Sequence, residues 1–249
     1  MVVPEFSIMR IAIISDIHGN YSALEQVISD IDQQNIDEIF CLGDIVGYGP
    51  SPNECVAQVN ERASVSLLGN HDAAAIGLDN IETFNTYAKE AILWTRKELS
   101  YNSKNYLSNL KMSHHAENLT YVHGSPLKPE EWTYIATIYV AMEQFSHFPG
   151  QVCFIGHTHV AIIFAQNQFS NLRIRNEGLS FEDKERYIIN VGAVGQPRDY
   201  DPKASYGILD TEKNHFEYRR IQYDIQKTQK LMENAGLPRY LIDRLADGR

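Results

Sequence analysis

The sequence predicts a layered α/β fold in which two β-sheets pack face to face. Strand-like apolar runs alternate with helical patterns up to residue 157, and beyond it strand-like runs follow one another closely. The chain has 249 residues, of which 43% are hydrophobic and 22% are charged, so it can bury a substantial core. Because no internal repeat or clear linker interrupts it, we expect one domain over residues 1–249.

Five apolar runs in the first part of the chain are expected to form strands that end in polar clusters. They cover residues 10–15, 38–42, 64–68, 119–122 and 152–155. Between the first two, apolar side chains at positions i, i+3, i+4 and i+7 over 24–31 predict a helix that covers a sheet. Further helices are expected over 84–99 and 139–148.

A capping box is expected where another helix begins. Ser51 stands at the cap position, Pro52 follows in the first turn, and Glu54 comes three residues after Ser51. These side chains can satisfy amides that lack a helical partner.

The later part of the chain is expected to be mostly strands, closed by a helix. The strand-like runs lie near 160–165, 171–175, 187–191, 205–210 and 215–223. In the closing helix, Asp224 is expected to cap the first turn and Gly236 to end the last. Ile225, Leu231 and Met232 are expected to face inward.

Composition and charge exclude several classes of protein. No apolar stretch approaches the roughly 18 residues that cross a bilayer, so no membrane span is expected. The formal net charge of -10 repels polyanions, so polymeric nucleic acid is not expected as a partner, whereas a small phosphorylated substrate is compatible with it.

The cysteines and the first residues bear on compartment. Cys41, Cys55 and Cys153 are odd in number, and two of them lie in apolar runs where a small buried side chain is expected, so a cytoplasmic location is predicted. The N-terminal segment lacks the pattern of a signal peptide. Since Met9 directly precedes the first strong strand, residues 1–8 are expected to be a leader or an expression remnant.

Residues of the types that bind metal ions lie just past the carboxyl ends of the expected strands, where α/β folds assemble their sites. The clusters are, in order, Asp16-Ile17-His18, Gly43-Asp44, Gly69-Asn70-His71-Asp72, His123-Gly124 and Gly156-His157-Thr158-His159. In a D-x-H or H-x-H pair, two alternate side chains can approach one ion, and neighbouring glycines let the backbone turn sharply. A single histidine is more often structural, but five such clusters at strand ends predict a metal site.

These clusters resemble the pattern of the calcineurin-like metallophosphoesterases, which runs D-x-H, G-D-x-x, G-N-H-D/E, H and G-H-x-H. All five blocks occur here in that order between residues 16 and 159. The resemblance implies a four-layer α/β/β/α sandwich of two mixed sheets flanked by helices. It also implies a hydrolase on the compact bacterial and archaeal phosphodiesterase and phosphatase branch, acting on phosphomonoesters or phosphodiesters of small molecules or nucleotides.

The resemblance further implies two divalent metal ions. The first would bind Asp16, His18 and His159, the second would bind Asn70, His123 and His157, and Asp44 would bridge them. Two ions about 3.5–4 Å apart can share a water, and attack of the bridging hydroxide on phosphorus is the implied mechanism. Manganese is the working choice, and Fe, Zn, Co or Ni also suit a mixed nitrogen and oxygen shell.

Five more residues take roles from the same resemblance. His71 matches a position that is not a ligand and would protonate the leaving oxygen or stabilise its charge. Asp72 would orient His71. The late segment 190–198 is similar to the family's N-P-G-S-x-x-x-P loop, although it departs from it at two positions, and Arg198 there would bind phosphate oxygens. Tyr48 would wall the substrate pocket and Gln196 would contact it.

Other functions stay open on the sequence. The segment 43–49 lacks the arginine of the protein-phosphatase pattern G-D-x-V-D-R-G, which disfavours a phosphoprotein substrate. Diadenosine polyphosphate cleavage is an alternative, since aromatic and acidic loops near 76–84 and 126–139 would wall a nucleoside pocket unless they merely pack. A non-catalytic scaffold with the same fold is the alternative of another class, and the intact Asp16, Asp44, Asn70 and His71 argue against it.

Outside the clusters, histidines and late tyrosines are expected to be structural. The histidines are His114, His115, His147 and His215. The tyrosines, which lie in strand-like runs and are expected to pack, are Tyr187, Tyr206, Tyr218 and Tyr223.

Overall fold

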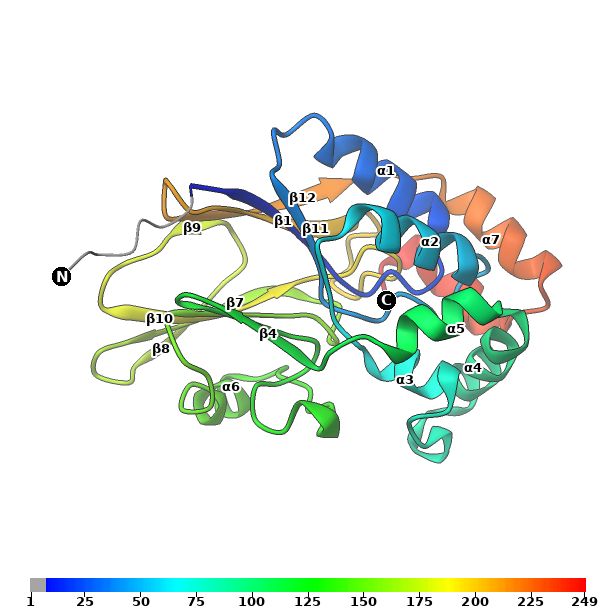
Figure 1. Cartoon of the computed structure of the whole chain (residues 1–249), viewed down its shortest axis with the longest axis horizontal. Helices are drawn as coiled ribbons and strands as arrows, with labels where there is room; N and C mark the ends of the chain where they lie inside the picture. Colours follow the sequence, from blue (N-terminus) through cyan, green and yellow to red (C-terminus); the bar gives the residue numbers. More distant parts are fainter. Residues whose placement is uncertain (1–7) are drawn as a thin grey trace.

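Two six-stranded sheets pack face to face, with helices on their outer faces, in the computed structural model of the chain (Figure 1). The structure describes residues 8–249, so the expectation of a leader over residues 1–8 lies outside the described residues except at Ile8. The predicted α/β/β/α sandwich of two mixed sheets is confirmed.

The first sheet has the strand order β3-β2-β1-β11-β12-β9. Its strands are β1 (Arg10–Ile14), β2 (Glu38–Cys41), β3 (Val65–Ser66), β9 (Leu179–Ser180), β11 (Ala204–Asp210) and β12 (His215–Ile221). Strands β1, β2 and β3 are parallel, with Ile13 opposite Phe40. On the other side of β1, β11 is antiparallel and sets Gly207 opposite Ile13.

The second sheet has the order β4-β5-β6-β10-β7-β8. Its strands are β4 (Ser113–Ala116), β5 (Leu119–Val122), β6 (Val152–Ile155), β7 (Ala161–Asn167), β8 (Leu172–Arg175) and β10 (Glu185–Val191). Strands β5, β6 and β10 are parallel, and β4, β7 and β8 pair antiparallel with their neighbours. The predicted metal-binding residues directly follow the carboxyl ends of the parallel strands in both sheets.

The central strands β1 and β6 are buried on both faces of their sheets, which explains why they are nearly continuous apolar runs. In β1, Ile11 and Ile13 point into the layer between the sheets, whereas Ala12 and Ile14 point toward the helices. The same alternation in β6 sends Phe154 into the inner layer.

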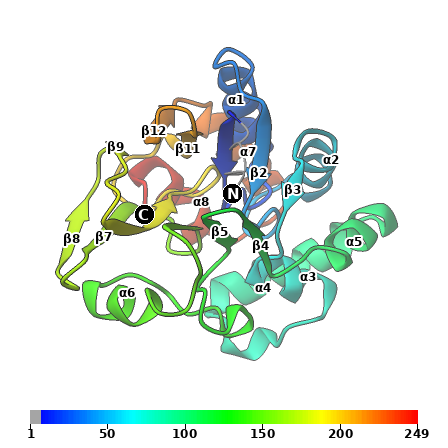
Figure 2. The same cartoon turned by 60° about the vertical axis from the view of Figure 1, so that its left-hand side comes forward.

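Helices cover the outer faces and close one end of the sandwich (Figures 1 and 2). The helices on the first sheet are α1 (Tyr21–Ile31) and α2 (Pro52–Arg62), with α7 (Ile225–Asn234) beside α1. Helix α6 (Ile138–Gln144) packs on the second sheet. The helices at the end are α3 (Asn70–Ile76), α4 (Thr86–Glu98), α5 (Tyr101–Ser108) and α8 (Arg239–Asp243). No helix in the described part of the chain is long and apolar enough to cross a membrane.

The strand expected over 64–68 is shorter than predicted. β3 has two residues. The amide of Leu67 still donates to Cys41 of β2, but Leu67 also forms an isolated bridge with Lys111, and the amide of Leu68 donates to the Lys111 carbonyl. The elements β4, β9, α3, α5 and α8 were not predicted, since short or polar segments carry little periodicity.

Two expectations about the helices are wrong, those for Ser51 and Leu231, and the expected cap at Asp224 is confirmed. Ser51 precedes α2, but its side chain makes no capping hydrogen bond, and its ψ of 57° differs from the 162° of Ser100, which does cap α5. Asp224 caps α7 as predicted, accepting from the amide of Lys227 at 2.9 Å. Leu231 does not face inward, because its side chain is 40% exposed.

The late tyrosines pack as predicted. Tyr187 and Tyr206 are buried, and the Tyr218 hydroxyl donates to the carbonyl of Asn190 at 2.9 Å.

Phe216 provides a test of the inner layer. Its ring is fully buried, contacts Phe154 at 5.6 Å between centroids, and occupies the space that a side chain at Gly207 would need. We expect Phe216→Ala to lower the free energy of unfolding by about 3–5 kcal/mol, because it leaves a cavity, as measured by urea denaturation. The matched control Phe169→Ala, at a side chain that is 75% exposed, should change it by less than about 0.5 kcal/mol. Equal losses in the two variants would contradict this packing.

Candidate metal centre

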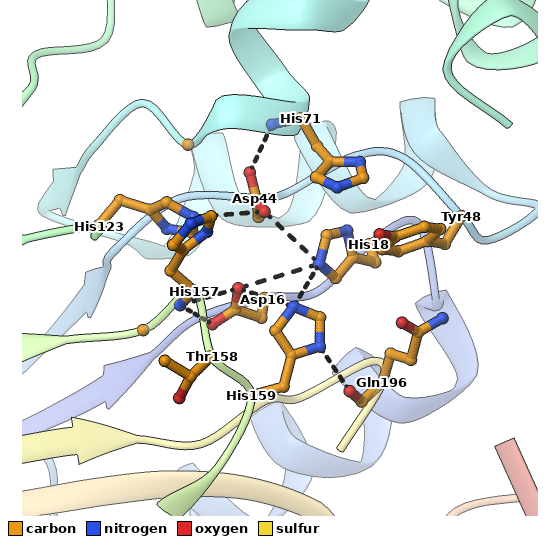
Figure 3. A network of polar contacts seen from close by, with 12 residues as sticks. Asp16, His18, Asp44, Tyr48, His71, His123, His157, Thr158, His159 and Gln196 are labelled. Carbon is orange, nitrogen blue, oxygen red and sulfur yellow. Dashed lines mark hydrogen bonds and ion pairs between the residues drawn. The ribbon is translucent and has the colours of Figure 1, made fainter. Parts of the chain in front are cut away.

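The polar clusters predicted from the sequence converge at the end of the sandwich where the strands β1, β2, β5 and β6 terminate (Figure 3). The seven predicted ligands are all buried, and they are Asp16, His18, Asp44, Asn70, His123, His157 and His159. They come from both sheets, so neither sheet alone contains the site.

Two groups of side chains have the spacing of metal ligands, and Asp44 belongs to both. One group is Asp16, His18, Asp44 and His159, and the other is Asp44, His123 and His157. Within each group the candidate ligand atoms lie within 4.8 Å of one another. Asp44 Oδ2 lies 3.6 Å from His18 Nε2 and 3.3 Å from His123 Nε2, so one carboxylate oxygen faces both groups. Asn70 lines a cavity together with His157 of the second group, and its buried Oδ1 has no hydrogen-bond partner.

A backbone carbonyl faces one ring nitrogen of each of the four histidines. Nδ1 of His18, His123 and His159 lies 3.1, 3.1 and 2.6 Å from the carbonyls of Val46, Leu42 and Gln196, in that order. For His157 the nitrogen is Nε2, at 2.9 Å from the carbonyl of Trp132. Because a carbonyl only accepts, that nitrogen carries the hydrogen, and in a neutral ring the other nitrogen keeps its lone pair for a metal.

The contact between His18 and His159 cannot be a hydrogen bond between neutral rings. Their Nε2 atoms lie 3.1 Å apart, and both are acceptors when both Nδ1 atoms donate. Burial lowers the pKa of each of these histidines, so the rings are neutral near pH 7. The separation matches two ligands about 2.1 Å from one ion at an angle of about 100°. The pair is therefore arranged for a shared cation.

The two buried carboxylates of the site need compensating charge. The side chains of Asp16 and Asp44 are fully buried. Burial would raise the pKa of Asp44, but His123 and His71 hold it well below its usual range. Burial would lower the pKa of His123, but the neighbouring carboxylates outweigh it and raise that pKa to about 9. Divalent ions would supply this compensating charge, so the residues present fit a metal centre.

The backbone at the site is held in the left-handed region. Asp16, His18, Asp44, His157 and His159 have φ between 51° and 67°, which costs on the order of 1–3 kcal/mol for each non-glycine residue. Residues with such strained backbone cluster at functional sites. Here the left-handed conformation directs alternate side chains toward the same site.

Two glycines allow the carboxylates to be enclosed. A side chain at Gly69 would collide with Asp44, and one at Gly156 would collide with Ser15 and Asp16. The glycines of the G-N-H-D and G-H-T-H clusters are therefore required by close packing.

Comparison with known proteins agrees with this geometry. The family description "Calcineurin-like phosphoesterase superfamily domain" matches residues 9–214. The chain belongs to this superfamily. It is 38% identical over 243 residues to the uncharacterized protein MJ0912 of Methanocaldococcus jannaschii, covering 96% of this chain and 98% of that one.

Solved structures show the same similarity. A metallophosphoesterase from Sphaerobacter thermophilus is 42% identical, with a TM-score of 0.86 over 98% of this chain and 100% of that chain. The hypothetical protein PH1004 from Pyrococcus horikoshii OT3 shares the fold at 18% identity, with a TM-score of 0.77 over 96% of this chain and 98% of that chain. Membership in the superfamily makes the chain a metal-dependent phosphoesterase, and hence a hydrolase.

Asp72 has partners other than the one the superfamily resemblance implied. Its carboxylate accepts from the amides of Val46 at 3.0 Å and Gly69 at 3.1 Å. His71 Nδ1 is buried without a hydrogen-bond partner, so the described residues show no hydrogen bond by which Asp72 would orient the imidazole. Asp72 instead ties the two loops that carry Asp44 and Asn70.

The late loop reaches the site through its backbone. The amide of Gly195 donates to the carbonyl of Asp16 at 2.9 Å, and the amide of Arg198 donates to the carbonyl of His159 at 3.1 Å. The Arg198 guanidinium donates to Gln196 Oε1 at 3.0 Å and Tyr48 Oη at 3.4 Å. The Tyr48 ring packs on His18 and lies 4.4 Å from the His71 ring.

Two supporting residues were not singled out from the sequence. Trp132 holds His157 through its carbonyl, an atom that every residue carries and that therefore leaves no sequence signal. Asn190 donates to Gly156 O and to Thr158 Oγ1, fastening the turn that carries both histidines of the G-H-T-H cluster. Its position before Gly192 in the late loop was the available signal.

Metal content tests the shared carboxylate. We expect about two divalent ions per chain for the purified protein loaded with Mn²⁺, and loss of both in Asp44→Ala, because both groups share that carboxylate. Elemental analysis after gel filtration gives the stoichiometry. The control His147→Ala, at an exposed histidine outside the clusters, should bind as many ions as the unaltered chain. Retention of both ions in Asp44→Ala would contradict the shared site.

Proposed function

We propose that the chain hydrolyses phosphomonoesters or phosphodiesters of small molecules, nucleotides among them, with two divalent metal ions. The observation that carries the proposal is that Asp44 belongs to both buried ligand groups, which suits a pair of ions joined by one carboxylate. The three cysteines are free and buried, which is consistent with a cytoplasmic enzyme.

In this proposal the ligands divide between two ions that share Asp44. Asp16, His18 and His159 would hold the first ion, and Asn70, His123 and His157 the second. When bound, the ions would act as Lewis acids that lower the pKa of a shared water and offset charge on the phosphoryl oxygens. Manganese is our first choice, and other first-row divalent ions suit the same donors.

His71 would act on the leaving oxygen. Its amide donates to Asp44 Oδ1 at 2.8 Å, which fixes its backbone beside the proposed ligands while its imidazole borders the adjoining cavity. Burial lowers the pKa of His71 to about 4, so the ring is neutral near pH 7 and can donate one hydrogen bond to developing negative charge. Stabilisation of the leaving oxygen is therefore favoured over full protonation.

Arg198 would bind the phosphoryl group. Its buried Nε has no hydrogen-bond partner, although another nitrogen of the same guanidinium contacts Gln196 and Tyr48. The free donor supports a contact to a phosphate oxygen, with Gln196 and Tyr48 holding the arginine in position.

Hydrolysis of 4-nitrophenyl phosphate and bis(4-nitrophenyl) phosphate tests the proposal. We expect turnover of at least one ester with added Mn²⁺, loss of turnover with a chelator, and recovery when metal is restored. The ratio of the two rates decides between phosphatase and phosphodiesterase. No metal-dependent turnover of any phosphate ester would overturn the proposal and favour a non-catalytic scaffold. Diadenosine tetraphosphate and a phosphopeptide, added to the same assay, test the two other substrate classes.

His71→Ala separates metal binding from catalysis. We expect kcat to fall about 10²–10⁴-fold, as for loss of a catalytic proton-transfer or charge-stabilising group, while the metal content stays at that of the unaltered chain. Rate measurement and elemental analysis on the same preparation check both. Loss of the ions from this variant would contradict the division between ligands and His71.

A further inference from the structure

A cavity of about 560 Å³ adjoins the proposed metal ligands. Asn70, His71 and His157 supply part of its wall. The segments 79–88 and 130–134 supply other parts of its wall. Its volume lies within the range of about 300–1,000 Å³ that small-molecule sites have. The group that is attached to a phosphate at the metal residues would therefore enter this cavity.

Two aromatic rings beside proposed site histidines line the cavity. Phe84 meets the His71 ring edge to face at 5.0 Å between centroids. Tyr134 stacks on the His157 ring at 3.8 Å with 26° between the planes. Tyr134 is 51% exposed, so much of this ring is still free to contact a ligand. A flat ring bound in the cavity would therefore find aromatic surface to stack on.

Trp132 connects the cavity wall to the metal residues. Its indole Nε1 donates to Asp79 Oδ2 at 2.9 Å across the two wall segments, and its carbonyl faces His157 Nε2. The φ of Trp132 is 53°, an uncommon conformation for a bulky residue that the surrounding contacts must maintain. Trp132 therefore both lines the cavity and holds the proposed ligand His157 in position.

The charge of the cavity is negative away from the metal residues. Asp79, Glu130 and Glu131 line it, and no lysine or arginine does so among the described residues. Lys128 pairs with Glu131 at 2.7 Å, whereas no ion pair involves Asp79 or Glu130 within residues 8–249. Carboxylates accept hydrogen bonds and repel phosphate. This wall therefore suits a ring with N–H donors and disfavours additional phosphate groups.

We infer that the organic group of the substrate is a nucleoside whose base stacks in this cavity and which carries one phosphoryl group at the metal residues. The inference rests on the proposed function and narrows it. An extended polyphosphate would face the carboxylates, and a simple aryl group, esterified through its only hydroxyl, would offer them no hydrogen-bond donor.

Calorimetric titration of the metal-loaded protein with adenosine, ribose and N-acetyltyrosinamide tests the inference. None of these ligands has a phosphate ester, so the result does not depend on turnover. We expect adenosine to bind at least about tenfold more tightly than ribose or N-acetyltyrosinamide, as stacking and hydrogen bonding of a base imply. Preferential binding of the tyrosine compound, or no difference between adenosine and ribose, would overturn the inference.

Phe84→Ala should weaken adenosine binding about tenfold, and Phe84→Tyr should restore it, because only the aromatic face is needed. The matched control Tyr139→Ala, at a side chain that is 79% exposed and outside the cavity, should bind adenosine as the unaltered protein does. If Phe84→Ala does not fold, the exposed Glu130 provides the second test. Glu130→Gln should increase affinity for adenosine diphosphate severalfold and change that for neutral adenosine much less, because the amide oxygen of glutamine still accepts a hydrogen bond. An equal effect on both ligands would contradict the role of charge.

The two proposals fail separately. Metal-dependent hydrolysis of the nitrophenyl esters without adenosine binding would remove only the nucleoside. Adenosine binding without hydrolysis of any ester would remove only the phosphoesterase mechanism.

Discussion

The structure depends on two carboxylates, Asp16 and Asp44, that are buried where the two sheets meet. A buried charge is tolerated only when other groups compensate it. Backbone amides provide part of the compensation, since His157 and His71 each donate from the main chain to one of these carboxylates. The remaining compensation has to come from positive charge inside the cluster. The left-handed backbone, the enclosed glycines and the carbonyls that face the histidines are the means by which the chain builds this environment.

The packing of the two sheets against each other determines the geometry of the metal site, because its residues follow strands of both sheets. Asp16 follows β1 of the first sheet, and its carboxylate accepts the amide of His157, which follows β6 of the second. The late loop after β10 contacts the segments that follow both strands, because the amide of Gly195 donates to Asp16 and the amide of Arg198 donates to His159. A change in how the sheets pack would therefore move ligands relative to one another, even if each loop kept its own shape.

The part of the site that performs chemistry and the part that selects a substrate have different origins. The metal-binding residues lie in short segments directly after strands, where the strand directions decide their positions. The cavity wall comes from longer segments between α3 and α4 and between β5 and α6. Such segments vary more freely than strand ends, so selectivity can change while the metal residues stay in place.

The sequence by itself determined the central strands, the main helices and the clusters at the strand ends, because these depend on local periodicity and on residue type. It did not determine the edge strands β4 and β9 or the helix α5, which are short or polar and form because neighbours are already present. Only the tertiary structure decided that Asp72 binds backbone amides and that Trp132 supports His157. The contact of Asp72 with the Gly69 amide is local to the start of α3. The contacts from Asp72 to Val46 and from Trp132 to His157 span 26 and 25 residues through main-chain atoms that all residues share, so no pattern of side chains indicates them.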